Sequence, residues 1–182
     1  MNKGKVFEGD VKNSCKNQGV YCLRLNDTSL SFIEEKNAKF TPKNPADFVL
    51  FSKPSLFLIE CKSTKYKSMS IQREESDNKA MIQAHQINSL IKASNYDGVY
   101  GGFLFNFRDE ENQLNDITYW LSIEDFSRFL EHEDKKSINA LNIVQYGGKV
   151  VTQHKVRTHF LYDIKDLIDR IQNGGVTNET SI

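Results

Sequence analysis

Two apolar runs joined by a short polar turn stand out in the first third of the chain. Residues 47–51 and 56–62 are apolar at most positions, and Ser52-Lys53-Pro54-Ser55 connects them. Runs of this length with consecutive apolar residues are typical of strands buried on both faces in the middle of a sheet. The short connection favours an antiparallel hairpin. We therefore expect two adjacent central strands here.

The second of these strands carries charge near its end. Because side chains alternate along a strand, Leu58, Glu60 and Lys62 should share one face. Cys61 should point to the other face, as a packing residue. In a hairpin with matched arms, the start of one strand lies beside the end of the other. Asp47, the first residue of the first strand, should therefore lie close to Glu60.

The rest of the pattern predicts further helices and strands. Helices are predicted at 5–18, 79–94, 122–131 and 163–173, and strands at 21–25, 30–33, 98–107 and 117–121. Elements of these lengths in mixed order predict an α/β fold with a mixed central β-sheet flanked by helices. The chain has 182 residues and no visible linker, so we expect one domain over 1–175 and a disordered tail at 176–182.

Composition narrows the class of protein. Hydrophobic residues make up 38% of the chain and charged residues 26%, and no apolar run approaches the roughly 20 residues that cross a bilayer. No apolar secretory segment follows the first residues. The three cysteines, Cys15, Cys22 and Cys61, lack metal-ligand spacing. We expect a cytoplasmic protein with reduced thiols and no membrane segment.

Charge is balanced over the whole chain but not along it. The 24 Lys+Arg residues cancel the 24 Asp+Glu residues. Residues 1–80 hold 14 basic and 10 acidic side chains, which gives +4, and residues 81–182 hold 10 and 14, which gives −4. A total of zero discourages a generic nucleic-acid binder. It does not exclude one, because the positions of the charges decide what they bind.

Asp47, Glu60 and Lys62 together suggest phosphodiester chemistry. Two carboxylates that meet at one point are costly unless a cation joins them, and oxygen ligands suit Mg²⁺, with Mn²⁺ as a substitute. The backbone carbonyl of Cys61 could add another oxygen. Lys62 could then orient a water on the metal or stabilise charge on a phosphate. An isolated Glu-x-Lys pair on a strand is, by contrast, most often a solvated ion pair.

The spacing of these residues resembles a known nuclease motif. Pro45-Ala46-Asp47, then 12 residues, then Glu60-Cys61-Lys62 resembles the PD-(D/E)xK motif. The surrounding segments are similar in order to RecU-type Holliday-junction resolvases: Gly4-Lys5-Val6-Phe7-Glu8, His85-Gln86-Ile87, Gly101-Gly102-Phe103-Leu104-Phe105, Tyr119-Trp120-Leu121 and Lys136-Ser137-Ile138. The segment between Leu30 and Asp47 is shorter than the stalk of those proteins, so we interpret the chain as a phage-type or shortened relative.

The resemblance implies a restriction-endonuclease-like core, a homodimer, Mg²⁺ dependence and paired nicks across a four-way DNA junction. It makes Asp47 and Glu60 metal ligands and Lys62 the catalytic lysine. It adds Glu8 as a further acidic residue near the metal and Gln86 as a glutamine beside the site. Glu8 has an alternative interpretation, in which it only favours the positive N-terminus of a helix.

Basic and hydroxyl side chains supply candidate DNA contacts. Those that follow the second strand are well placed to meet phosphates beside the cleaved bond, although charge runs are often simply solvated. The candidates are Lys5, Ser63, Thr64, Lys65, Lys67 and Arg73. A second cluster, His154, Lys155, Arg157 and His159, is either another DNA contact or a device that protects a strand edge.

These observations predict a Mg²⁺-dependent, structure-selective DNA endonuclease that resolves four-way junctions in recombination and repair. Two alternatives stay open. One is a nuclease of the same fold that acts on duplex, flap or other branched DNA. The other is a junction-binding or recombination-regulating protein that does not cut, against which the intact Asp47, Glu60 and Lys62 argue.

Overall fold

The protein was analysed as a computed structural model that describes residues 2–25, 44–74 and 79–174. The strand predicted at 30–33 and the tail predicted at 176–182 lie outside these residues. Within them, every helix is too short or too polar to span a membrane.

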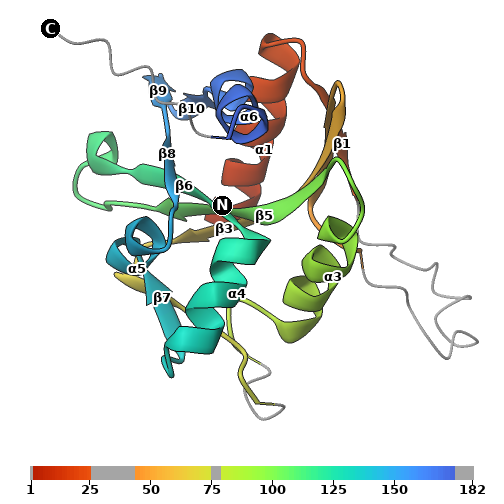
Figure 1. Cartoon of the computed structure of the whole chain (residues 1–182). Coiled ribbons are helices and arrows are strands. Elements are labelled where there is room, and N and C mark those ends of the chain that lie inside the picture. The colour runs from red at the N-terminus through yellow and green to blue at the C-terminus, as the bar shows by residue number, and fades with distance from the viewer. Residues whose placement is uncertain (1, 26–43, 75–78, 175–182) are drawn as a thin grey trace, which may run out of the picture.

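A six-stranded mixed sheet forms the centre of the fold (Figure 1). Its strands, in spatial order, are β1 (Tyr21–Arg24), β2 (Phe48–Ser52), β3 (Ser55–Thr64), β5 (Val99–Phe107), β6 (Ile117–Ser122) and β8 (Lys149–Val151). Strands β3 and β5 run parallel, and the other neighbours are antiparallel. The predicted α/β class with a mixed central sheet is therefore confirmed, as is the β2–β3 hairpin.

Helices cover both faces of this sheet (Figure 1). Helices α1 (Lys3–Asn17) and α6 (Ile164–Gln172) pack on one face, and α3 (Ala84–Ser94), α4 (Ile123–His132) and α5 (Ala140–Gln145) pack on the other. A short 3-10 helix, η2 (Gln113–Asn115), lies between β5 and β6. Each face has its own cluster of buried apolar side chains, so the sheet separates two cores.

Strand β3 contributes side chains to both cores in the predicted alternation. Leu58 packs with the core under α3 and α4, whereas Phe57, Ile59 and Cys61 pack with the core under α1 and α6. Glu60 lies between these apolar positions and is only 4% exposed. The alternation therefore places Glu60 on the α3 side of the sheet.

The helix predicted at 79–94 begins later than expected. Helix α3 starts at Ala84, and its N-cap residue Gln83 has an extended backbone. Ile82 instead forms a parallel bridge with Ile71 and is fully buried. The predicted range began at 79, but Ile82 pairs as a strand-like segment, so the helix starts only after it. The helices predicted at 5–18, 122–131 and 163–173 are confirmed to within a few residues as α1, α4 and α6.

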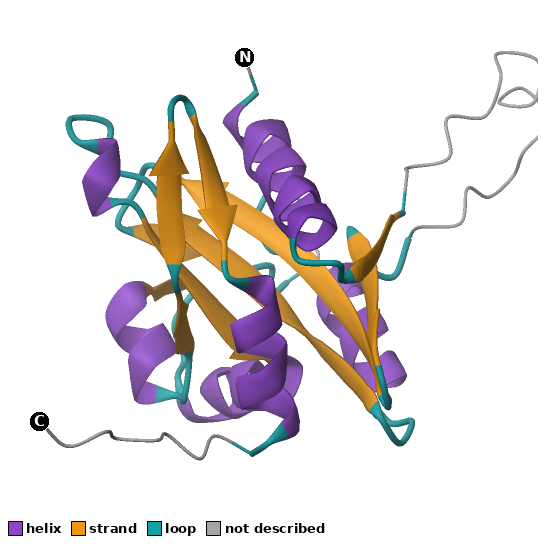
Figure 2. Ribbon diagram, turned by 90° about the horizontal axis from the view of Figure 1, so that it is seen from above, coloured by secondary structure: helices purple, strands orange, loops and turns teal. Residues whose placement is uncertain are grey.

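Two small sheets were not predicted. Strand β4 (Ser68–Ser70) pairs with β7 (Ser137–Asn139), and β9 (Gln153–Val156) pairs with β10 (His159–Tyr162). The first joins segments that are far apart in the sequence, so no local pattern could indicate it. The second is a hairpin that lies beside α1 (Figure 2).

Candidate active site at the end of strand β3

Asp47 lies next to Glu60, as the hairpin predicted. Phe48 pairs with Ile59, so the residue before Phe48 comes opposite the residue after Ile59. The backbone N–H of Asp47 donates to the Ile59 carbonyl at 3.1 Å. Its carboxylate Oδ2 accepts a 2.8 Å hydrogen bond from the Cys61 N–H. Asp47 thus stands directly before β2, and its carboxylate is held against the continuing strand β3.

Two donors hold the Glu60 carboxylate. Lys62 Nζ lies 3.0 Å from Glu60 Oε1, and Gln86 Nε2 on α3 donates to the same oxygen. Gln86 Oε1 in turn accepts a 3.0 Å hydrogen bond from the Gln83 N–H, so both ends of this amide are fixed. The Glu60 side chain is 5% exposed and that of Lys62 is 13% exposed. The sequence predicted both neighbours, Lys62 from strand alternation and Gln86 from the family resemblance.

The electrostatics of the pair are unfavourable without further positive charge. Burial raises the pKa of Asp47, the hydrogen bond from Cys61 lowers it, and the charge of Glu8 raises it further. Burial also raises the pKa of Glu60 to about 7, which Lys62 opposes and the charges of Asp47 and Glu8 reinforce. Carboxylates that are buried beside each other in this way favour either a shared proton or a bound cation. The three carboxylates of Glu8, Asp47 and Glu60 outnumber the two cations, Lys62 and Arg24, so a further positive charge would be favourable here.

Glu8 on α1 belongs to this group, but it already has a partner. It acts on the charge state of both Asp47 and Glu60, and it forms an ion pair with Arg24 at the end of β1. Glu8 lies beyond the first turn of α1, which contains no acidic residue. The ion pair, not the start of the helix, therefore explains its position.

Arg24 is a site residue that the sequence interpretation missed. It pairs with Phe48 across the β1–β2 register, one residue from Asp47. Its Nε is buried and has no hydrogen-bond partner among the described residues, although the side chain as a whole is 38% exposed. Only the pattern of a single arginine at the end of a short strand could have indicated it, and that pattern is not specific.

The donor set fits a hard divalent cation. Within the described residues no group of three or more His, Cys, Asp or Glu side chains is arranged as a metal cluster. Mg²⁺ is usually held by one or two carboxylates together with waters and substrate phosphates, so a pair of carboxylates is enough for it. Asp47 and Glu60 provide that pair, and both of their pKa values are raised partly by mutual or neighbouring negative charge. A cation would relieve this repulsion.

Two of the predicted DNA contacts are used inside the protein. Ser63 Oγ donates to Asn106 Oδ1 at 2.9 Å and accepts from Arg108 Nε at 3.0 Å. Thr64 is 3% exposed, and its hydroxyl accepts from the Tyr66 N–H. Both were expected to face phosphates because they follow the strand directly. The structure corrects this expectation, since these hydroxyls satisfy local polar groups.

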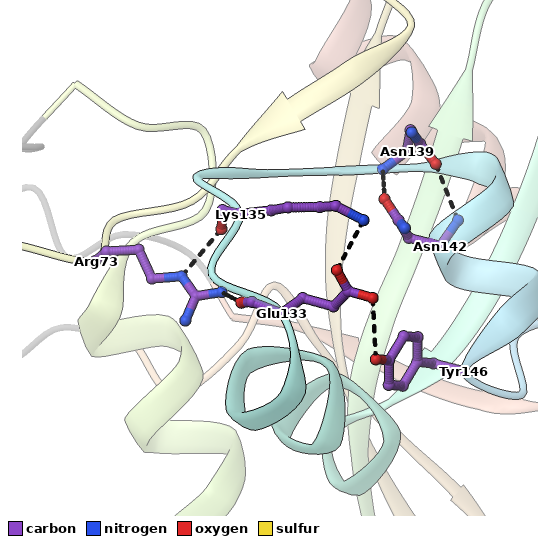
Figure 3. A network of polar contacts seen from close by, with 6 residues as sticks. All are labelled: Arg73, Glu133, Lys135, Asn139, Asn142 and Tyr146. Carbon is purple, nitrogen blue, oxygen red and sulfur yellow. Dashed lines mark hydrogen bonds and ion pairs between the residues drawn. The ribbon is translucent and has the colours of Figure 1, made fainter.

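Arg73 was also predicted to contact DNA, and the structure gives it another role. Its guanidinium donates to the backbone carbonyl of Leu130 in the last turn of α4. It also donates to the carbonyls of Glu133 and Lys135 just after this helix (Figure 3). These carbonyls are left free by the ending helix, and an arginine satisfies them well. Arg73 therefore fastens the end of α4 and is no longer a candidate phosphate contact.

The remaining predicted contacts stay available. Lys65, Tyr66 and Lys67 are exposed in the turn that follows β3, and Lys65 forms a 3.2 Å ion pair with Glu110. Lys5 is exposed on the first turn of α1. An exposed pair such as Lys65–Glu110 contributes little and can be exchanged for a phosphate.

Comparison with known proteins places the chain in a family. No protein-family model matches it. It is 32% identical over 177 residues to the SPbeta prophage-derived uncharacterized protein YotM of Bacillus subtilis (strain 168), covering 91% of this chain and 85% of that protein. The chain therefore belongs to the family of this prophage-derived protein.

A solved structure also resembles the fold. Hjc of Archaeoglobus fulgidus, a Holliday junction resolvase, aligns with 78% of this chain and 93% of its own, with 14% sequence identity and a TM-score of 0.49. Similarity at this level does not assign an activity. The chemistry has to be argued from the residues of the site.

Proposed function

We propose that this protein is a metal-dependent endonuclease that cuts DNA. The observation that carries the proposal is the pair of neighbouring carboxylates, half-buried Asp47 and buried Glu60, beside Lys62 on a central strand. A purely structural Glu–Lys pair has no need of a second carboxylate that raises its pKa. Carboxylates, a lysine and a restriction-endonuclease-like hairpin together fit the cleavage of a phosphodiester.

Mg²⁺ is the cofactor that we propose, with Mn²⁺ as a substitute. Asp47 and Glu60 would hold it, with the backbone carbonyl of Cys61 as a further oxygen ligand. When bound, the ion lowers the pKa of a coordinated water and neutralises charge on the phosphate. Glu60 Oε1 already accepts from Lys62 and Gln86, so Oε2 is the oxygen that is left for a ligand.

Lys62 is the proposed catalytic lysine. Its ammonium has three N–H donors, and one of them faces Glu60 at 3.0 Å. The others can point to the attacking water or to a non-bridging phosphate oxygen, where positive charge stabilises the transition state. Because Glu60 fixes the ammonium in place, little reorganisation is needed when the substrate binds.

Glu8 and Arg24 form a second pair beside the carboxylates. Arg24 neutralises Glu8 in the absence of substrate. A phosphate that reaches the site can take Arg24 as its partner, since the guanidinium suits phosphate oxygens. Glu8 is then free to act as the additional acidic residue near the metal.

The proposed substrate is branched DNA, and in particular the four-way junction. The motif order from Gly4 to Ile138 supports it. Balanced charge supports it too, since weak bulk attraction leaves recognition to the shape of the DNA. Paired nicks require two active sites related by symmetry, so we propose a homodimer. A nuclease of the same fold that acts on duplex or flap DNA is the second candidate.

A cleavage assay on synthetic DNA tests the proposal. A labelled four-way junction and a linear duplex of the same sequence are incubated with the protein, with Mg²⁺ or with EDTA. We expect symmetric nicks in the junction with Mg²⁺, and loss of cleavage in Asp47→Asn and Lys62→Ala. Glu131→Gln is the matched control, because Glu131 is exposed on α4 and far from the site in sequence.

The outcomes separate the candidate functions. Equal cutting of the duplex and the junction contradicts the resolvase activity but keeps the nuclease. Tight junction binding with neither Mg²⁺- nor Mn²⁺-dependent cleavage contradicts the enzyme and supports a non-cleaving junction protein. Unchanged cleavage by Asp47→Asn contradicts the site itself.

A further inference from the structure

The β9–β10 hairpin is a basic, exposed feature of an otherwise acidic half of the chain. No Asp or Glu occurs from Lys149 to Tyr162, whereas residues 81–182 as a whole carry a net charge of −4. The residues of the hairpin from His154 to His159 are all exposed. The hairpin forms its own two-stranded sheet outside the central one and lies beside α1 (Figure 2). Its tip therefore contributes nothing to either core.

The base of the hairpin is nevertheless firmly anchored to α1. The buried carboxylate of Asp10 lies 2.7 Å from His159 Nδ1 and accepts a 3.0 Å hydrogen bond from the Phe160 N–H. Ser14 Oγ accepts from the Tyr162 N–H at 2.9 Å. The hairpin therefore has an exposed tip, and three polar contacts hold its base to α1. It projects from the same helix that carries Glu8.

Arg157 occupies a backbone conformation that does not suit it. Val156 pairs with His159, so Arg157 and Thr158 form a two-residue turn. Arg157 has φ 58°, in the left-handed region, which glycine adopts freely and arginine does not. A turn of this kind with a positive φ at its first position normally has glycine there. An arginine at this place indicates that its side chain is needed.

Other basic residues gather around the same tip. Thr158 lines a small cavity of about 50 Å³ together with Lys3 of α1 and Arg108 of the β5–β6 connection. Burial raises the pKa of Asp116 in this cavity, and the hydrogen bond from Asp109 and the charges of Arg108 and Lys155 oppose the rise. Arg108 and Asp116 both line this cavity, so part of the positive charge beside the tip faces a carboxylate.

Helix α1 connects this basic region to the proposed active site. Lys3 and Glu8 are five residues apart on α1, which corresponds to about 7.5 Å along the helix axis. Their side chains point in different directions, because five residues turn roughly 140° around that axis. A duplex arm that meets both the site and the hairpin tip therefore has to cross α1.

We infer that the β9–β10 hairpin is a DNA-backbone contact, in which Arg157 and Lys155 bind phosphates of the duplex arm next to the site. The inference deepens the proposed nuclease function and rests on it. Protection of a strand edge does not account for Arg157, because this residue lies in the turn and not on an edge.

Equilibrium binding to a labelled 30-base-pair duplex and to a four-way junction with the same arms tests the inference. Binding is measured in EDTA, which prevents cleavage, over a series of salt concentrations. Arg157→Gly should lower the affinity roughly threefold to tenfold and reduce the slope of log K against log salt by about 0.9. The double variant Arg157→Gly/Lys155→Ala should reduce that slope by about 1.8.

Two controls distinguish the loss of a DNA contact from a loss of stability or a general change of charge. Arg157→Gly should leave the melting temperature unchanged or raise it, because glycine relieves the left-handed conformation. Lys92→Ala removes the same charge from an exposed position in the last turn of α3 and should change the affinity less than twofold. Equal effects of Arg157→Gly and Lys92→Ala overturn the inference, as does a loss of affinity that comes with a lower melting temperature.

The assay separates this inference from the nuclease proposal. If the protein cleaves DNA with Mg²⁺ but binding ignores the hairpin, only the hairpin contact is wrong. If Arg157→Gly weakens binding but no cleavage occurs with Mg²⁺ or Mn²⁺, the nuclease proposal is wrong and the contact stands. If the wild-type protein binds neither DNA, both are wrong.

Discussion

Glu60 and Asp10 are buried to the same degree, but their hydrogen-bond partners are arranged differently. Each is only 4% exposed. Both oxygens of Asp10 have their own partner, His159 for one and the Phe160 N–H for the other. In Glu60 both donors, Lys62 and Gln86, converge on a single oxygen. Asp10 thus has a partner for each oxygen, whereas among residues 2–25, 44–74 and 79–174 both donors to Glu60 use Oε1.

The neighbours of the two carboxylates sharpen the contrast. Asp47 and Glu8 add negative charge around Glu60, and its pKa rises to about 7. Asp10 instead faces an imidazole and a backbone N–H. Burial of a carboxylate is therefore not by itself a sign of function. A buried carboxylate whose neighbours repel it is a better candidate for a functional site, because the repulsion costs free energy that a bound cation would relieve.

The largest expected difference between the two sites is in cleavage. Asp47→Asn should lower the rate of DNA cleavage by roughly a thousandfold or more, because it removes a metal ligand of the proposed site. Asp10→Asn should change the single-turnover rate of the folded protein less than threefold. Single-turnover cleavage with saturating protein and Mg²⁺ measures both. Comparable losses in the two variants would show that the site is misplaced.

Stability as a function of pH should also distinguish Glu60. Its folded pKa of about 7 lies above the ordinary 4.5, so the folded state holds a proton that the unfolded state releases. Its contribution is therefore fully present below pH 4.5 and is lost as pH rises to 7, by about 3 kcal/mol. The difference in unfolding free energy between wild type and Glu60→Gln, from urea titrations in EDTA, should decrease across this window. A difference that stays constant from pH 4.5 to 8 contradicts the raised pKa.

Loss of the Asp10 anchor should cost stability. Asp10→Asn places an amide where the carboxylate accepts from His159 and the Phe160 N–H, so at least one buried donor loses its acceptor. We expect the free energy of unfolding to fall by about 1 to 3 kcal/mol at pH 7, measured with urea. Asp134→Asn, at an exposed position after α4, is the control and should have no measurable effect.

Removal of Gln86 should lower cleavage less than removal of Asp47 does. Gln86 positions Glu60 and does not itself reach the substrate, and loss of such a positioning group lowers activity or metal affinity roughly tenfold to a hundredfold. Gln86→Met keeps the length of the side chain but lacks the amide. Mg²⁺ titrations of cleavage should show a higher half-saturation concentration, whereas Asn88→Ala on the same helix should not. An unchanged Mg²⁺ dependence would mean that Gln86 only packs.

The sequence predicted the site where it depended on local geometry. Strand alternation placed Glu60 and Lys62 on one face, and the matched hairpin brought Asp47 beside them. Both rules involve residues within about fifteen positions of one another. They hold regardless of what the rest of the chain does.

The sequence interpretation was wrong where long-range contacts decided the role of a residue. Arg73 and Thr64 looked like phosphate contacts because they lie at or after the end of strand β3. Arg73 donates hydrogen bonds to backbone carbonyls at and just after the end of α4. Thr64 is buried, and its hydroxyl accepts from the Tyr66 N–H. Ile82 lay within the range of a predicted helix but pairs with Ile71. The local pattern could not identify the partners of Arg73 and Ile82, whereas Thr64 is used by its own turn.

By itself, the sequence determined the α/β class, the central hairpin and the trio of Asp47, Glu60 and Lys62, because hydrophobic period and strand alternation act over short distances. Only the tertiary structure decided that Arg24 neutralises Glu8, that Asp10 fastens the basic hairpin to α1, and that Gln86 and Lys62 share one oxygen of Glu60. These contacts join segments whose approach depends on how the whole sheet and its two helical layers pack.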